Sequence, residues 1–213
     1  MKIIKPSFEI LTPINREEIF KHLETIARTC YKSEDKITDQ SAPKMIKSLI
    51  RNHHLAMLEH FIISVKMTID RGVSHEIVRH RIASYAQEST RYCNYNQGKF
   101  GGEITVIEPL FFDKDTPEYF IWAESCLRAE QAYNELIQMG RSPQEARSVL
   151  PNSLKTEIVV TMNLREWIHF FNLRAFGTTG APHPQMKEIA LMVLAEFSNQ
   201  LPEIFGDMYF DAV

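Results

Sequence analysis

The segment that most limits the fold is "FIISVKMTI", residues 61 to 69, in which apolar and polar side chains alternate. Ser64, Lys66 and Thr68 point to one side of an extended chain. The other side carries only apolar residues, namely Phe61, Ile63, Val65, Met67 and Ile69. A repeat of two residues is the repeat of a β-strand, so this segment is predicted to be a strand with one face buried.

Helical patterns surround that strand. Apolar faces with a helical period are found in "NREEIFKHLETIARTCY" and "SAPKMIKSLIRN". A long helix is predicted with Pro117 at its first position and Gly140 just past its end. Asn163 is predicted to cap "LREWIHFFNLR", and residues 185 to 199 are predicted to form a last helix.

Further strands are predicted at residues 3 to 11, in "ITVIEP" and in "KTEIVVTM". We read "DRG" as a turn and "VSHEIVRHR" as a short helix, whereas residues 82 to 102 have no clean period and end in the loop "NYNQGKFGG". Strands and helices do not alternate regularly as in βαβ units. We therefore predict an α+β fold, a mostly antiparallel sheet packed with helices, as a single domain over residues 1 to 213.

Composition narrows the classes of function. The formal net charge is −3 at pH 7, which argues against general nucleic-acid binding. Cys30, Cys93 and Cys126 are widely spaced and form no CxxC pair, so a reducing, cytoplasmic setting is expected. The first residues do not resemble a signal peptide, and no apolar run is long enough to span a membrane.

The densest group of anion-binding side chains is "RHRIASYAQESTRY", residues 79 to 92. It combines arginines, whose planar fork of donors suits phosphate, with hydroxyl side chains and with tyrosines that can stack on a ring. Gln87 can pair with the edge of a base. These ingredients favour a nucleotide over a bare anion. The alternative is a solvated surface loop whose arginines pair with Glu76 or Glu88.

A second polar segment, "HHLAMLEH", brings His53 and His54 near Glu59 and His60. These residue types can bind metals, but the HExxH spacing is absent and no cysteine lies near in the sequence, so we predict no metal site. The alternative is a loop that enters the strand at residue 61, with Glu59 or His60 bound to a polar partner.

No residue is marked as a catalytic nucleophile. Cys126 lies in the apolar stripe of the long helix, and the other two cysteines lack activating neighbours. Ser89 is not in a G-x-S-x-G turn, and there is no Rossmann fingerprint or Walker A motif. The residues alone leave three classes open: a nucleotide-modifying enzyme, a non-catalytic nucleotide- or RNA-binding module, and a metal-dependent nucleotide hydrolase.

The stretch at 79 to 92, with RHR followed after seven residues by Ser, resembles the signature of the flavin-dependent thymidylate synthases, the thymidylate synthase-complementing family. Other blocks of that family are similar, in the family's order, to "ARTCY", "LEHF", "ARSVLPNSLKT" and "MNLREWIHFFNLR". The resemblance covers residues 25 to 190.

The resemblance implies an enzyme that reductively methylates dUMP to dTMP in thymidylate biosynthesis. It implies methylenetetrahydrofolate as carbon donor and NADPH as reductant, acting through bound FAD. It also implies a homotetramer whose active sites lie between subunits. No nucleic acid or membrane is expected as a partner, given the charge and the hydropathy described above.

The resemblance also implies roles for single residues. Those implied to bind flavin are His54, Ala56, Glu59, Arg79, His80, Arg81, Gln87, Asn163, Arg165 and His169. Those implied to bind dUMP are Glu76, Arg79, Gln87, Glu88, Ser89, Thr90, Arg91, Arg147 and Arg174. Within the signature, RHR would face the flavin and "QESTR" the nucleotide phosphate. His183 resembles a histidine near the flavin.

Arg174 is the catalytic residue that the resemblance implies, placed against the uracil ring. Uracil C5 is a poor nucleophile, and no cysteine here is set up to add to C6. An arginine stabilises negative charge that develops on the ring, while the flavin carries the redox step. The chain departs from some members of the family at two positions, with Gln87 in place of Glu and Glu76 in place of Gln.

Overall fold

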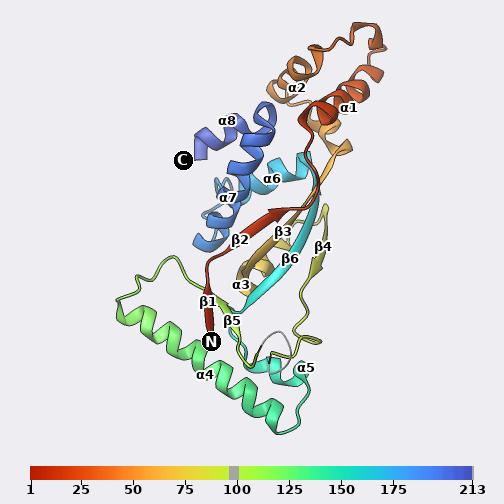
Figure 1. The fold of residues 1–213 in the computed structure, drawn as a ribbon. Coiled ribbons are helices and arrows are strands. Elements are labelled where there is room, and N and C mark those ends of the chain that lie inside the picture. The colour runs from red at the N-terminus through yellow and green to blue at the C-terminus, as the bar shows by residue number, and fades with distance from the viewer. Residues whose placement is uncertain (96–100, 213) are drawn as a thin grey trace. The chain divides into compact units, whose positions relative to one another are not determined.

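The structure is a computed structural model that describes residues 1–95 and 101–212 (Figure 1). The strands are β1 Lys2–Ile4, β2 Ser7–Ile10, β3 Ile62–Asp70, β4 Ala83–Gln87, β5 Thr105–Ile107 and β6 Lys155–Asn163. The α-helices are α1 Arg16–Thr29, α2 Ser41–Arg51, α3 Arg71–Ile77, α4 Pro117–Gln138, α5 Pro143–Ala146, α6 Leu164–Arg174, α7 Pro184–Gln200 and α8 Pro202–Ala212. Short 3₁₀ helices are η1 Glu34–Lys36, η2 Leu55–His60 and η4 Arg147–Val149.

The main sheet has four strands in the order β2-β3-β6-β4, and β1 pairs with β5 in a separate parallel pair. Strands β3 and β6 are antiparallel. The Leu164 N–H donates to the Phe61 carbonyl at 3.0 Å beyond one end, and the Arg71 N–H donates to the Leu154 carbonyl at 3.0 Å beyond the other. The predicted α+β fold with a mostly antiparallel sheet is confirmed.

The chain divides into two compact units. The first unit comprises Met1–Ser7, Lys66–Arg79 and Tyr85–Val159, and the second unit comprises Phe8–Val65, His80–Ser84 and Val160–Val213. The signature stretch therefore contributes to both units, since His80–Ser84 belongs to the second and the flanking residues to the first. A single domain over the whole chain stays a prediction.

Each unit has its own core. In the first unit Tyr133 and Cys126 of α4 are buried with Tyr95, Val106 and Leu154. Burial raises the pKa of the Cys126 thiol, which agrees with its predicted inert packing role. The second unit is centred on buried aromatic rings of α6, α7 and α8 at centroid separations of 5.2–5.8 Å, namely Trp167, Phe170, Phe171, Phe197 and Phe205.

Most of the predicted helix boundaries are confirmed. Asn163 caps α6, because its Oδ1 accepts from the Glu166 N–H at 2.8 Å. Helix α4 begins at Pro117, and Gly140 just beyond its end has a φ of 83°, the left-handed conformation that favours glycine. The strand predicted at 61 to 69 is β3, in which Ile63, Val65, Met67 and Ile69 are almost fully buried. Phe61, predicted on the same face, lies just before the strand and is partly buried.

Two local predictions are wrong. "DRG" is no turn, because the Asp70 Oδ1 accepts from the Val73 N–H at 2.7 Å and so caps α3, which starts at Arg71. Residues 82 to 102 contain a strand, β4, at the edge of the sheet. An edge strand that is partly exposed on both faces need not show apolar alternation, which is why the pattern was missed. The loop predicted as "NYNQGKFGG" lies partly outside the described residues.

Two further boundaries differ from the prediction. Residues 3 to 11 form two strands, β1 and β2, that belong to different sheets, with Pro6 between them. The helix at the carboxyl end is followed by another, α8, which starts at Pro202. None of the helices in the described part of the chain has the length and apolar content needed to cross a membrane.

Candidate active site

The first unit brings together two of the residues expected to bind dUMP. Arg147, at the start of η4, donates from Nη1 to the Thr90 Oγ1 at 3.3 Å. Both side chains line a cavity of about 240 Å³, together with Arg71 and His75 of α3 and the turn at Asn152. Arg147 is exposed while Thr90 is buried. The cavity therefore offers two guanidinium groups and a hydroxyl to an anion.

Arg71 was missed in the sequence. Its guanidinium donates to the Glu88 carbonyl at 3.4 Å and lies 3.5 Å from the Thr156 Oγ1. The available signal was its place directly after a buried strand, at the first position of a helix that Asp70 caps. Gln87 reaches the same region, since its Nε2 donates to the Ser74 Oγ at 2.9 Å and to the Thr156 Oγ1 at 3.2 Å.

The remaining residues of "QESTR" have protein partners. The Glu88 carboxylate accepts from the Lys155 Nζ at 2.9 Å and from the Tyr95 hydroxyl at 3.4 Å, and burial raises the pKa of that tyrosine. The Ser89 Oγ accepts from the Arg91 N–H at 3.3 Å, and the Arg91 Nε donates to the Gln144 Oε1. Glu88, directly after β4, thus links that strand to Lys155 of β6. Its carboxylate does not pair with the loop arginines, as the alternative interpretation assumed.

The second unit gathers four of the residues expected to bind flavin. A cavity of about 410 Å³ is lined by Glu59 of η2, by Asn163 at the cap of α6, and by Arg165 and His169 of that helix. Arg165 and Glu59 form an ion pair, which confirms the expectation that Glu59 or His60 binds a polar partner. Ile82 and Glu166 complete the lining.

Two more of the flavin residues line a separate cavity of the same unit. His54 and Ala56 belong to an opening of about 260 Å³ with Cys30, Tyr31 and other residues of α1, α2 and η2. Its lining is mainly apolar. Because η2 contributes Ala56 to this cavity and Glu59 to the other, one short helix serves both.

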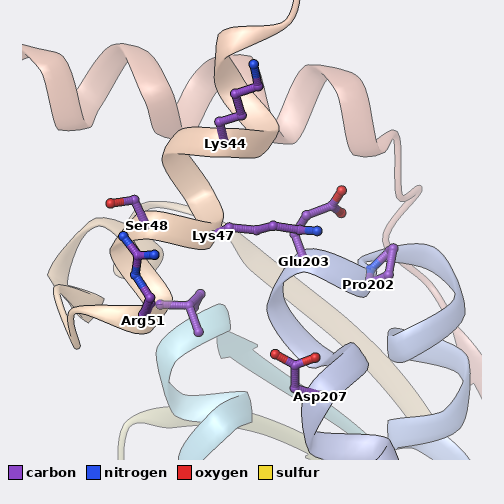
Figure 2. A pocket seen from close by; sticks show the side chains of 8 residues that line it. Lys44, Lys47, Ser48, Arg51, Pro202, Glu203 and Asp207 are labelled. Atoms are coloured by element: carbon purple, nitrogen blue, oxygen red, sulfur yellow. The ribbon is translucent and has the colours of Figure 1, made fainter.

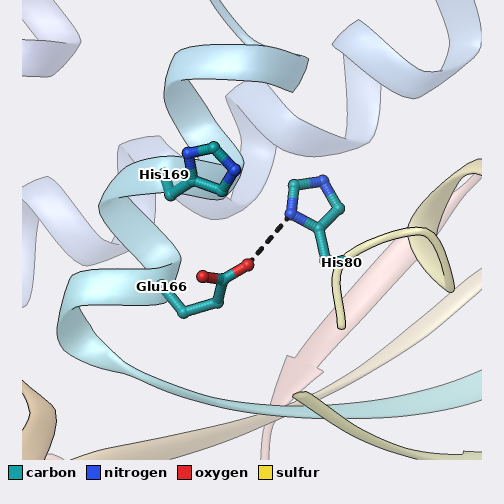
Figure 3. A group of neighbouring side chains, drawn as sticks. All are labelled: His80, Glu166 and His169. Carbon is teal, nitrogen blue, oxygen red and sulfur yellow. Dashed lines mark hydrogen bonds and ion pairs between the residues drawn. The ribbon is translucent and has the colours of Figure 1, made fainter. Parts of the chain in front are cut away.

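His80, the centre of RHR, is buried at the second unit's polar cluster. Its Nδ1 lies 3.2 Å from the Glu166 Oε1, and its Nε2 accepts from the Arg174 Nε at 3.1 Å. The ring of His169 stands edge-on at a centroid separation of 5.7 Å. Figure 3 shows His80 facing the Glu166 carboxylate, with His169 beside them on α6.

Burial sets the charge of this cluster. Desolvation, reinforced by the positive charge of Arg174 and by His169, lowers the pKa of His80 to about 4. Burial also raises the pKa of Glu166, although His169 acts in the opposite direction. His80 is therefore neutral at neutral pH. Glu166 was missed in the sequence, yet its i,i+3 spacing to His169 marks a shared helix face.

His80, Glu166 and His169 also have atoms close enough for a metal, all within 4.8 Å of one another. The contact with Arg174 disfavours that use, because its guanidinium occupies the lone pair of the His80 Nε2 and its charge repels a cation. The chemistry of the donors fits a hydrogen-bonded chain better than a metal centre.

Four further predicted residues lie near the end of α3 or at the start of α7. Arg79 and Arg81 follow the end of α3 and are exposed, and Glu76 in the last turn of α3 is half-buried. His183 is exposed and stands at the start of α7. Their implied contacts with flavin or dUMP stay predictions.

A further cavity of the second unit, about 530 Å³, contains none of the predicted residues. Figure 2 shows its lining, with Lys44, Lys47 and Arg51 from α2 and the carboxylates Glu203 and Asp207 from α8. Cations and carboxylates are mixed across this opening, and Glu203 is already ion-paired. Such a lining has no strong preference for an anion.

Comparison with known proteins identifies the class to which this fold and site belong. The family model described as "Thymidylate synthase complementing protein" matches residues 15–203. The flavin-dependent thymidylate synthase of Pyrococcus furiosus is 34% identical over 170 residues, covering 79% of this chain and 67% of the relative. That of Geobacter sulfurreducens is 31% identical, covering 85% and 78% respectively. The chain belongs to the thymidylate synthase complementing protein family.

Solved structures agree on the fold. Two structures of the UMP/dUMP methylase PolB from Streptomyces cacaoi match this chain, one bound with 5-Br dUMP and the other with 5-Br UMP. Their TM-scores are 0.77 and 0.74 at 19% and 18% sequence identity, and they cover 97% and 100% of this chain and 96% and 97% of their own. Because the curated relatives are synthases, the prediction of an enzyme is confirmed over that of a non-catalytic binding module.

Proposed function

We propose that this protein methylates dUMP reductively to dTMP, with methylenetetrahydrofolate as the carbon donor and NADPH, through bound FAD, as the reductant. Membership of the family supports the reaction. The structural observation that carries the proposal is that predicted flavin-binding residues from separate elements line one cavity. Glu59 comes from η2 and Asn163, Arg165 and His169 come from the start and middle of α6, yet all four line one cavity.

The two cavities that are lined by expected flavin residues suit the two kinds of surface that FAD presents. The larger cavity offers the Arg165 guanidinium, the Asn163 amide and the His169 imidazole, which are donors for phosphate and for ring heteroatoms. The smaller one, around Ala56 and Met57, is mainly apolar and suits a flat ring. FAD held there would supply hydride transfer to the carbon that is reduced.

The nucleotide phosphate is assigned to the first unit. Arg147 and Thr90 are in contact, and Arg71 lines the same cavity. Two guanidinium groups match a dianionic phosphate by charge and by geometry. Ser89 then serves as a ligand and not as a nucleophile, in keeping with its hydrogen bond to the backbone of Arg91.

Arg174 is assigned to the uracil ring. The contact between its Nε and His80 fixes the direction of the guanidinium. Because His80 is neutral, this contact orients the arginine without neutralising its charge. The charge is then available to stabilise negative charge on the uracil ring, and so to favour the electron-rich form of the ring whose C5 attacks the methylene carbon.

The wider setting follows from the family. We assign the enzyme to the cytoplasm and to a homotetramer with active sites between subunits, with folate and NADPH as its other small-molecule partners. The reducing compartment is supported by cysteines that are all free, namely Cys30, Cys93 and Cys126.

Replacing Arg174 tests the assignment of roles. The Arg174→Ala protein is expected to retain FAD, seen in its visible absorbance, and to lose nearly all dTMP formation. The reason is that the substitution removes a charge used in the transition state and leaves the cavity lined by Arg165 and Asn163 intact. Full turnover by this variant would remove Arg174 from the mechanism.

A further inference from the structure

His80 is held between two charged groups. Its side chain is almost fully buried, with 2% of its surface exposed, and that of Glu166 is 9% exposed. One ring nitrogen faces the Glu166 carboxylate at 3.2 Å, and the other faces the Arg174 guanidinium at 3.1 Å. The three residues form a continuous chain from a carboxylate, through an imidazole, to an arginine.

The donors in this chain fix where the ring proton sits. A guanidinium can only donate hydrogen bonds, so the His80 Nε2 that faces Arg174 must carry a lone pair. In a neutral imidazole the other nitrogen then carries the hydrogen, and Nδ1–H donates to the Glu166 carboxylate. The pKa of His80, lowered to about 4, agrees with a neutral ring.

The fold holds Glu166 in place at the other end of the chain. It occupies the third position of α6, where its N–H donates to the capping Asn163 at 2.8 Å. Its neighbour Trp167 is fully buried, and the indole donates to the Ile63 carbonyl of β3 at 3.2 Å. The first turn of α6 is thus fixed at its backbone and at its core, which leaves the carboxylate little freedom to move.

We propose that Glu166 is a positioning residue: its carboxylate selects the Nδ1–H tautomer of His80, and the lone pair left on Nε2 aims Arg174. The inference rests on the proposed function, because Arg174 matters only if it acts on uracil. Glu166 is also in the lining of the cavity assigned to FAD, but the carboxylate oxygen used in this role faces the His80 Nδ1. It acts through the imidazole, as carboxylates do that orient metal-binding or catalytic histidines.

Glu166→Gln removes the selection while keeping the size of the side chain. A glutamine amide accepts from Nδ1–H or donates to a bare Nδ1, so both tautomers of His80 become populated. In the Nε2–H form, two donors face each other at the Arg174 contact. We expect kcat to fall about 10–100-fold, the usual cost of losing such an orienting partner, with the KM for dUMP unchanged.

Two matched variants distinguish loss of control over the His80 tautomer from a general loss of stability. Glu166→Asp keeps the charge and is expected to recover part of the lost kcat. Glu24→Gln removes another buried carboxylate, which is 1% exposed and bound by the Arg28 Nε at 2.8 Å. It is expected to lower stability and to leave kcat unchanged.

The direct readout is the ¹⁵N spectrum of the FAD-bound protein labelled at histidine, with the His80 signals assigned by comparison with His80→Gln. The native protein should show a bare Nε2 and a protonated Nδ1 at neutral pH, and Glu166→Gln should show a mixture. A native His80 in the Nε2–H or imidazolium form overturns the proposal, and this holds even if the variant does not fold. So does a folded Glu166→Gln protein with native kcat and the native tautomer.

These outcomes are distinct from failure of the proposed function. If the native protein makes no dTMP, the reaction is wrong, while the tautomer of His80 is still measured in the same spectrum. If the native protein makes dTMP and Glu166→Gln is indistinguishable from it, the reaction stands and the role of Glu166 falls.

Discussion

At the scale of single residues, the hydrogen-bond partners of a side chain show which role it can take, where the residue type alone allows several. Ser89 and Glu88 both have side chains that can take part in catalysis. In the structure, however, the Ser89 hydroxyl accepts from a backbone N–H of its own loop, and the Glu88 carboxylate accepts from a lysine. Thr90 and Arg147 are ordinary by type but are 3.3 Å apart at a cavity. The proposed binding of dUMP therefore rests mainly on Thr90 and Arg147, with Ser89 as a further ligand.

Arg147→Ala tests that assignment. Loss of one charge-assisted hydrogen bond costs about 2 kcal/mol, so the KM for dUMP should rise about 10–100-fold while FAD binding is retained. Arg128→Ala is the matched control, because Arg128 is exposed on α4 and pairs only across one helical turn with Glu124. Steady-state kinetics with dUMP as the varied substrate decide, and equal KM values for both variants would contradict the assignment.

His80 predicts a pH dependence of stability. Its pKa is about 4 in the folded protein, against an ordinary value of 6.5 for an exposed histidine in an unfolded chain. Between these values the unfolded state binds a proton that the folded state does not. Stability is therefore full above pH 6.5, falls as the pH drops towards 4, and loses nothing more from this group below it.

The size of that effect is on the order of 3 kcal/mol. Charged or titratable groups that face His80 include Glu166, His169 and Arg174. Urea unfolding of the native protein and of His80→Gln across this pH range isolates the histidine, because other titrating groups are common to both. Parallel stability curves for the two proteins would show that His80 is not buried in a neutral form.

At the scale of elements, helix caps and the position of a strand in the sheet explain which elements could be predicted from the sequence. Helices α4 and α6 were predicted because Pro117 and Asn163 mark their starts and apolar stripes mark their faces. Strand β3 was predicted because one of its faces is buried throughout. Strand β4 has no such face, since it lies at the edge of the sheet, and so its sequence carries no period.

The start of α3 gives an element-scale prediction. Asp70 is 6% exposed and its Oδ1 accepts from the Val73 N–H at 2.7 Å, which anchors the turn that carries Arg71. Asp70→Ala should lower the free energy of unfolding by about 1–2 kcal/mol. Asp70→Asn keeps an acceptor and should cost much less, as measured by urea denaturation. Equal losses for the two variants would show that the cap is not what Asp70 contributes.

At the scale of the whole molecule, the family was predicted from the sequence, but the contacts between the candidate site residues were not. Four expected flavin residues do line one cavity. Arg71 and Glu166 were missed because the residues that they contact, Thr156 in one case and His80 in the other, are distant in the sequence. A single sequence read by period and motif does not contain such pairings, because they arise only when separate elements pack.

The distribution of charge over the chain also bears on the binding of anionic substrates. A net charge of −3 is compatible with anionic substrates, because the cations concentrate where they are needed, at Arg71 and Arg147 in one unit and at Arg165 and Arg174 in the other. Local charge and not net charge determines such binding.

The most direct test of the central claim follows the transferred carbon. The purified protein is incubated with FAD, NADPH, dUMP and methylenetetrahydrofolate labelled with ¹³C at the methylene group, and the nucleotide product is analysed by mass spectrometry and NMR. The proposed function requires dTMP whose methyl carbon is labelled, formed only when the flavin and NADPH are both present. Unlabelled dUMP recovered unchanged from the complete mixture, by a protein shown to bind FAD, would contradict it.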